Sequence, residues 1–246
     1  MGFEIHEGQP RRLHRSHPTY GASVGIMILD TGFQRFPGDI GYAETFAFNV
    51  QYAVLRGVHF GADLKPDQGT LEKFFRVIDD LVALGVDGIT TSCGFLAVMQ
   101  PHLTEYSPVP VASSSLLQIP LVQRILPKNK RIGVVTAKKP NLSPAHFEGV
   151  GAPTDLPVAG MPLDGVFRRN METRNPNIDL AAQEAEVIEV VRGLLRENPD
   201  IGALVLECTN LSPYSHAIEK LFGLPVYDVI TMINWFHSGL RPTRYA

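Results

Sequence analysis

The residues of this chain best suited to chemistry are its two cysteines, each placed where a strand gives way to a helix. Cys208 follows a segment, 203–207, that begins with a short apolar run typical of a buried parallel strand, and Cys93 follows the segment 88–92 with the same order of strand, cysteine and helix start. After Cys208, the Ser212-Pro213 pair predicts a helix with Ser as N-cap and Pro as first helical residue. Ligands of open α/β sheets bind at the carboxyl ends of the strands. We therefore expect both thiols at a ligand-binding edge.

The spacing of the cysteines indicates a duplicated chain. They are 208 − 93 = 115 positions apart, close to half of the 246 residues. The strand-like run 24–30 has a counterpart at 131–136, and the Pro-Val pair at 110–111 has one at 225–226. The pattern predicts an α/β fold of two pseudo-symmetric lobes. Each lobe is a mostly parallel sheet flanked by helices, with the active site in the cleft between them.

The predicted domain organisation has three parts. Residues 1–22 form a polar N-terminal arm. Residues 23–115 together with 226–246 form lobe 1, which carries Cys93, and residues 116–225 form lobe 2, which carries Cys208. Within the lobes we expect a helix capped by Thr70, a polar loop over 165–179, and either a strand or a short helix near 51–58.

Two thiols facing one cleft could perform acid–base chemistry. A helix N-terminus lowers the pKa of a cysteine, so one thiolate can act as a base and the opposite thiol as an acid. Placed on opposite faces of a substrate carbon, the pair would invert that carbon. Hydroxyl and amide donors of Ser92, Thr209 and Asn210 could stabilise the carbanion.

Other side chains have weaker claims to a role. Asp30 ends a predicted strand, and could orient a thiol, bind a substrate ammonium or only cap a turn. We expect Arg35 to be exposed, although it could hold a substrate carboxylate, as could Arg168 or Arg169.

Composition excludes several function classes. A net charge of −3 and a pI of about 6.2 argue against a nucleic-acid partner. No apolar run reaches the roughly 20 residues of a membrane span, and the first residues do not resemble a signal peptide. We expect a cytoplasmic protein with reduced cysteines and no membrane partner. Neither histidine spacing nor glycine-rich motifs indicate a metal or a cofactor, so we expect none.

From Val24 to Phe236 the chain resembles the aspartate/glutamate racemase superfamily. The resemblance rests on Leu-Asp30-Thr-Gly, Thr-Ser-Cys93-Gly-Phe, Gly-Val-Val-Thr136 and Glu-Cys208-Thr-Asn. It implies cofactor-independent catalysis by Cys93 and Cys208. It also implies a set of substrate contacts, namely Asp30, Thr31, Ser92, Gly94, Thr136, Thr209 and Asn210.

Two departures from the superfamily pattern concern the substrate. Amino-acid racemases commonly read Cys-Asn-Thr at the first site, where this chain has Cys93-Gly-Phe. Glutamate racemases read Cys-Thr-His at the second site, where this chain has Cys208-Thr-Asn. Both departures argue against glutamate, and Phe95 indicates a less polar pocket.

These observations predict an isomerase: a racemase or epimerase of an amino acid or a related carboxylate. Its partners would be a small anionic carboxylate substrate and further copies of the chain in a homo-oligomer. A decarboxylase, a cis–trans isomerase, a non-catalytic ligand-binding module and a thiol-redox sensor remain alternatives.

Overall fold

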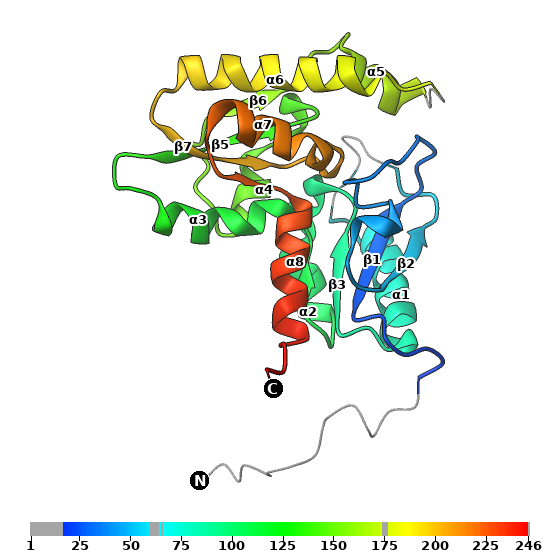
Figure 1. Cartoon of the computed structure of the whole chain (residues 1–246). Helices are drawn as coiled ribbons and strands as arrows, with labels where there is room; N and C mark the ends of the chain where they lie inside the picture. The colour runs from blue at the N-terminus through cyan, green and yellow to red at the C-terminus, as the bar shows by residue number, and fades with distance from the viewer. Residues whose placement is uncertain (1–16, 60–63, 65, 174–176, 246) are drawn as a thin grey trace, which may run out of the picture.

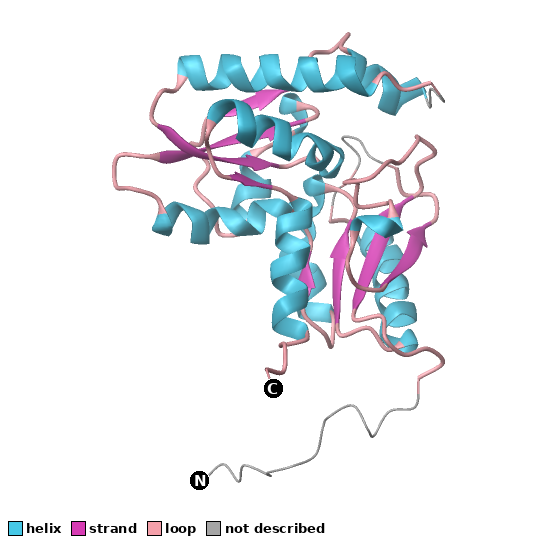
Figure 2. Ribbon diagram, in the orientation of Figure 1, coloured by secondary structure: helices cyan, strands magenta, loops and turns pink. Residues whose placement is uncertain are grey.

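The computed structural model describes residues 17–59, 64, 66–173 and 177–245. Residues 1–16 of the predicted N-terminal arm lie outside the described part. Figure 1 shows two lobes whose sheets run in different directions, and Figure 2 shows helices covering both. Among the helices of the described residues, none combines the length and apolarity needed to cross a membrane.

The first lobe is built on a parallel sheet with strand order β2-β1-β3-β4. Its interior strands are buried on both faces, which explains the continuous apolar sequence of β1; the buried threonines of β3 donate their hydroxyls to backbone carbonyls. The elements of this lobe are β1 (Val24–Leu29), η1 (Ala43–Thr45), β2 (Val50–Leu55), α1 (Gln68–Leu84), β3 (Gly88–Thr91), η2 (Gly94–Met99), α2 (Gln100–Tyr106) and β4 (Val111–Ala112).

The second lobe repeats this architecture with strand order β6-β5-β7-β8, again all parallel. Its elements are η3 (Ser115–Gln118), α3 (Ile119–Ile125), β5 (Arg131–Thr136), η4 (Lys139–Asn141), α4 (Pro144–Glu148), β6 (Val158–Gly160), α5 (Val166–Thr173), α6 (Leu180–Glu197), β7 (Ile201–Leu206), η5 (Thr209–Tyr214), α7 (Ser215–Phe222) and β8 (Val226–Tyr227). The two sheets have the same order of strands along the chain. The predicted two-lobed parallel α/β fold is confirmed.

The last helix, α8 (Val229–Leu240), crosses back to the first lobe. Its buried residues Met232 and Ile233 pack with Val24 and Ile26 of β1. The strand β8 just before it pairs with β7, so residues 226–227 belong to the second sheet and not to lobe 1, where the sequence predicts them.

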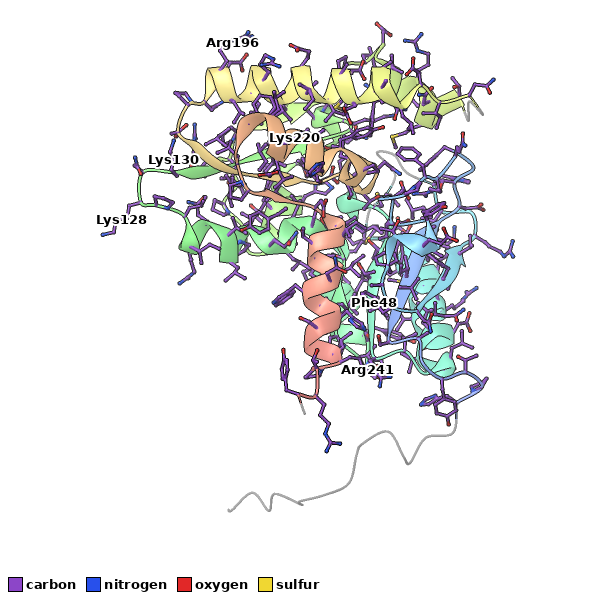
Figure 3. The ribbon with its side chains drawn as sticks, viewed as in Figure 1. Phe48, Lys128, Lys130, Arg196, Lys220 and Arg241 are labelled. Carbon is purple, nitrogen blue, oxygen red and sulfur yellow. The ribbon has the colours of Figure 1, made fainter. Side chains whose placement is uncertain are left out.

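Contacts near its C-terminal end fasten α8 to the first lobe (Figure 3). Phe48 stacks on His237 with ring centroids 3.6 Å apart, and Arg241 Nε lies 2.9 Å from the Asp87 carboxylate. In the same view Lys128 and Lys130 project from the far side of the second lobe, away from the first lobe. These two cations therefore do not contribute to a site between the lobes.

Three local predictions are wrong in instructive ways. The helix α1 begins at Gln68 rather than at Thr70, because the carboxylate of Asp67 accepts the Thr70 N–H and acts as N-cap. The predicted polar loop contains α5, whose first two N–H groups donate to Glu186 of α6. A carboxylate on a neighbouring helix thus caps a segment whose own sequence lacks a cap.

The third error concerns the segment after Cys208. Thr209–Tyr214 forms the 3₁₀ helix η5 with Pro213 inside it, and α7 starts only at Ser215. Ser212 is therefore not a helix N-cap; its hydroxyl donates to the Thr209 carbonyl within η5. The ambiguous segment near 51–58 is the edge strand β2, followed by a turn at Gly57.

Candidate active site

Cys93 and Cys208 lie at equivalent points of the two lobes, between a parallel strand and a 3₁₀ helix. Both are free thiols with little exposure, 7% and 8%. They line one pocket between the lobes, as the duplicated sequence predicts for a shared cleft. This cysteine pocket has about 540 Å³ of empty space including its mouth. Its lining is Leu29, Thr31, Phe33, Arg35, Ser92, Cys93, Gly94, Phe95, Ala137, Lys138, Arg168, Met171, Glu172, Glu207, Cys208, Thr209 and Asn210.

Both thiols are held in their neutral form. Burial raises the pKa of the Cys93 thiol to about 12, and the negative charge of Glu207 adds to the rise. Burial and the same carboxylate raise the pKa of Cys208 well above its ordinary value. Our expectation that the helix starts would lower these pKa values is wrong. Backbone N–H groups do act in that direction, but the loss of water outweighs them.

The two thiols differ in their hydrogen-bonding environment. The N–H groups of Phe95 and Leu96 both favour a thiolate at Cys93. At Cys208 only the N–H of Asn210 does so, while the Asn210 side-chain oxygen lies 3.8 Å from the sulfur and accepts the thiol proton. Cys93 is therefore the better site for a thiolate, and Cys208 for a neutral thiol.

Glu207 is the main residue of the site that our sequence interpretation missed. It lines the pocket directly before Cys208, and none of its surface is exposed. Thr136 donates a hydrogen bond of 2.5 Å to Glu207 Oε2, whereas Oε1 has no hydrogen-bond partner within the described residues. Burial raises the pKa of this carboxyl to about 7, against the lowering effect of Thr136. In the sequence, the feature that could have identified Glu207 is its place as a single acidic residue at the end of an apolar strand.

Gly94 explains how Glu207 fits between the two cysteine segments. A Cβ atom at Gly94 would come within 2.0 Å of the Glu207 carbonyl oxygen and 2.3 Å of Oε1. Only a residue without a side chain can follow Cys93 here. The departure from the Cys-Asn-Thr pattern is thus accounted for sterically.

A buried ionic network forms one wall of the pocket. Asp39, only 1% exposed, pairs with Arg35 at 2.8 Å, and Asn210 donates to its other oxygen at 2.6 Å. Arg35 also donates to Thr31 at 3.1 Å and lies over the ring of Phe33. We expected Arg35 to be exposed; that was wrong because Asp39, four residues later, turns it inward.

Further charged groups surround the pocket mouth. Lys138 and Arg168 both pair with one oxygen of Glu172, at 2.8 and 3.0 Å, and these two contacts lower the pKa of that carboxyl. Arg168 Nε is buried and finds no acceptor among the described residues. Arg169, by contrast, is exposed and donates to a backbone carbonyl.

Most of the sequence-predicted site residues come together, but not all in the expected role. Ser92 and Thr209 line the pocket, yet their hydroxyls are used in structural bonds. The Thr209 hydroxyl donates to the Ser92 carbonyl and so joins the lobes, and the Ser92 hydroxyl accepts the N–H of Leu29 within the first lobe. Thr136 does not line the pocket and lies behind Glu207. Asp30 borders an adjoining hollow, where its carboxylate accepts the Gly57 N–H.

The described residues contain no group of three or more His, Cys, Asp or Glu side chains placed to hold a metal ion. The chemical resources of the pocket are thus two thiols, a carboxyl between them, cations near one wall and aromatic rings. This set suits proton transfer at a carbon atom of a charged substrate.

Solved structures share the fold. The chain is similar to arylmalonate decarboxylase with a TM-score of 0.60 and 13% identity, over 91% of this chain and 94% of that one. For allantoin racemase from Klebsiella pneumoniae the values are 0.61 and 16%, over 89% and 87%. For a glutamate racemase isoform from Bacillus anthracis they are 0.57 and 16%, over 89% and 83%. The predicted fold of the aspartate/glutamate racemase superfamily is confirmed.

Sequence relatives point to a different reaction. The chain is 28% identical over 230 residues to a dimethylsulfoniopropionate lyase of Durusdinium sp. clade D, covering 89% of this chain and 75% of that protein. It is 32% identical over 236 residues to dimethylsulfoniopropionate lyase 7 of Emiliania huxleyi (strain CCMP1516), covering 89% and 67%. No protein-family profile matches the chain.

These relatives overturn our prediction of a racemase or epimerase, and with it the isomerase class. The error has a physical origin, since a pair of facing thiols can remove a proton whether or not the proton is returned to the opposite face. With 32% identity to a relative of which it covers 67%, the chain belongs to the family of the dimethylsulfoniopropionate lyases.

Proposed function

We propose that this protein is a lyase that cleaves dimethylsulfoniopropionate into dimethyl sulfide and acrylate. The observation that carries the proposal is the cysteine pocket itself, with a thiol and a buried carboxyl beside cationic and aromatic groups. The names of the relatives support the choice of substrate.

The substrate is well suited to cleavage by a base alone. Its carboxylate makes the neighbouring α-carbon the site of proton removal, and its sulfonium group on the β-carbon leaves as a neutral sulfide. A base takes the α-proton, the C–H electron pair becomes the new double bond, and the β-carbon–sulfur bond breaks with its electrons on sulfur. The balanced reaction yields dimethyl sulfide, acrylate and one proton, and it requires no redox step.

Cys93 is our choice for the base. Two backbone N–H groups favour its thiolate, whereas Cys208 keeps its proton toward Asn210. A neutral Cys208 thiol can instead donate to the carboxylate of the substrate as negative charge develops on it. One-sided proton removal thus gives each thiol a separate task.

Recognition of the substrate needs a site for each of its two charges. Arg168, whose buried Nε has no acceptor among the described residues, and Arg35 are the cations that could hold the carboxylate. The ring of Phe95 offers an apolar, electron-rich surface to the sulfonium group, whereas the Phe33 ring already lies under Arg35. A zwitterionic substrate accounts for a pocket that combines cations with aromatic walls.

The test is to incubate the purified protein with dimethylsulfoniopropionate and to measure dimethyl sulfide by gas chromatography and acrylate by liquid chromatography. We expect equal amounts of both. The folded protein releasing neither product across the neutral and alkaline range would overturn the proposal.

Serine variants assign the two thiols. We expect Cys93→Ser to lower the turnover number by about 10²–10⁴-fold, the usual effect of removing a general base. Cys208→Ser retains a donor of similar size, so its loss should be smaller. The opposite ranking would make Cys208 the base, and full activity in both variants would exclude either thiol from the reaction.

A further inference from the structure

Glu207 is a buried acid whose hydrogen bonding is incomplete. Its Oε2 accepts from Thr136, but its fully buried Oε1 has no partner within the described residues. Leaving a buried carboxyl oxygen unsatisfied is unfavourable for folding. The proton-removal step described above makes no use of this group.

The position of Glu207 couples it to both thiols. It immediately precedes Cys208 in the chain, and its Oε1 approaches Gly94, the residue after Cys93, so closely that no side chain fits there. The charge of Glu207 acts on both sulfurs. The carboxyl therefore lies between the two cysteine segments, inside the pocket lining.

We propose that Glu207 is the proton acceptor that converts Cys93 from a thiol into the thiolate base. This inference rests on the proposed elimination for the reaction that it serves. In the resting site Glu207 is a carboxylate and Cys93 a thiol. The thiol proton passes to a Glu207 oxygen, so the net charge of the pair is unchanged while the base is formed.

The proton balance of a full cycle follows from this step. The Cys93 thiolate takes the α-proton and becomes a thiol again, while dimethyl sulfide and acrylate leave. Glu207, now a carboxylic acid, loses its proton to solvent before the next cycle. One proton is released for each substrate cleaved, as the overall reaction requires.

The acceptor must be matched to neutral pH, and Glu207 is. Burial raises its pKa to about 7, so near neutrality it both accepts and releases a proton readily. A carboxyl at its ordinary value would be a much weaker acceptor for a thiol. The other charged or titratable groups that line the pocket are Cys208, Arg35, Lys138, Arg168 and Glu172, with Asp39 behind Asn210.

The experiment compares Glu207→Gln with Glu207→Asp and with a structural control. Glutamine has the same size and can keep the contact to Thr136, but it cannot accept the proton. Asp228→Asn serves as the control because Asp228 is also a buried carboxyl with a raised pKa, yet it caps α8 outside the pocket lining. It should lower thermal stability without altering the pH profile of activity.

The first measurement is dimethyl sulfide release as a function of pH. The wild type should lose activity below about pH 7, where Glu207 is already protonated. Glu207→Gln should be about 100-fold slower at neutral pH, and its rate should keep rising into the alkaline range as Cys93 ionises directly. Glu207→Asp, with a carboxylate, should restore the neutral acidic limb. Wild-type rates with an unshifted profile in Glu207→Gln would overturn the inference.

The second measurement needs no substrate and follows alkylation of Cys93 by iodoacetamide in a Cys208→Ser background. In Glu207→Gln, Cys93 should react more slowly near pH 7, where its proton has no acceptor, and faster at pH 8–9, where the Glu207 charge no longer disfavours direct ionisation of the thiol. Identical alkylation profiles with Glu and Gln at position 207 would overturn the coupling. If the wild type released no dimethyl sulfide, the proposed function would fail, and this arm would still decide whether Glu207 controls the thiol.

Discussion

At the scale of single residues, the cysteine pocket is shaped by close approach as much as by chemistry. Gly94 and Glu207 come from different lobes and touch where any larger residue would collide. The two residues therefore form one structural unit, and we expect substitution of either one to change the stability of the protein.

Glu207 makes the stability of the protein depend on pH. Its pKa rises from an ordinary 4.5 to about 7 in the folded state, so the folded state binds its proton more tightly than the unfolded state does. The resulting stabilisation is fully present below about pH 4.5 and is lost as pH rises through 7. From the size of the shift, the wild type should lose about 2–3 kcal/mol relative to Glu207→Gln between pH 5 and pH 8.

Urea unfolding of both proteins at several pH values measures this difference. The difference in unfolding free energy between the wild type and Glu207→Gln cancels the contributions of all titrating groups that the substitution leaves unchanged. A difference that does not vary with pH would show that Glu207 has an ordinary pKa.

Gly94→Ala should damage both the site and the fold. The new methyl group would overlap the Glu207 carbonyl, which is backbone and cannot rotate away. We expect a destabilisation of about 1–3 kcal/mol and loss of most dimethyl sulfide release. Gly193→Ala is the matched control, because its Cβ meets nothing within 4 Å among the described residues and lies inside α6. It should stabilise the protein by about 0.5–1 kcal/mol. Equal thermal shifts in the two variants would contradict the steric argument.

At the scale of elements, the loop after β1 is held in place by its ionic network rather than by regular hydrogen bonding. Asp39 accepts from Arg35, from the Gly41 N–H and from Asn210 of the second lobe. The loop that carries Phe33 and Arg35 into the pocket is thus fastened to the segment that carries Cys208.

Asp39→Ala should release this loop. The substitution leaves Arg35 and Asn210 without their buried partner, which typically costs about 3–5 kcal/mol. Urea unfolding checks the loss, and Glu72→Ala provides a control, since its pair with Arg76 is 3.9 Å long and exposed on both sides. That control should change stability by less than about 0.5 kcal/mol. Similar losses in both variants would mean that burial does not strengthen the Asp39 pair.

At the scale of the whole molecule, the pocket lies between two separately built sheets, so a ligand there binds both lobes. Hydrogen bonds from Thr209 to Ser92 and from Asn210 to Asp39 already join them. A ligand that spans the pocket should therefore stabilise the entire fold rather than one lobe.

Dimethylsulfonioacetate offers a test, because it carries both charges of the proposed substrate but has no β-carbon from which sulfide could leave. At a free concentration of about 100 times its dissociation constant, it should raise the free energy of unfolding by about 2.7 kcal/mol. Thermal melts with and without it measure the effect. Acetate, which lacks the sulfonium group, should stabilise much less at equal concentration. Equal shifts from both compounds would argue against a sulfonium site.

Local sequence patterns specify the two lobes and place each thiol at the end of a strand. Apolar runs of four to six residues specify buried strands wherever they lie, and the repeat at 115 residues makes the halves equivalent. Since each cysteine follows a parallel strand, the topology places each thiol at the carboxyl edge of its own sheet. The motif that identified the superfamily fold consists of these local features.

The chemistry around the thiols depends on how the two lobes pack against each other. The orphaned oxygen of Glu207, the inward turn of Arg35 and the capping of α5 by Glu186 all depend on residues distant in sequence or on burial that local patterns do not report. Thiol pKa values follow the same rule, because desolvation depends on how the lobes close over Cys93 and Cys208, and here it outweighs the helix starts. Local sequence specifies the backbone position of each of these side chains. The packing of the second lobe against the first buries them and so sets their charge state.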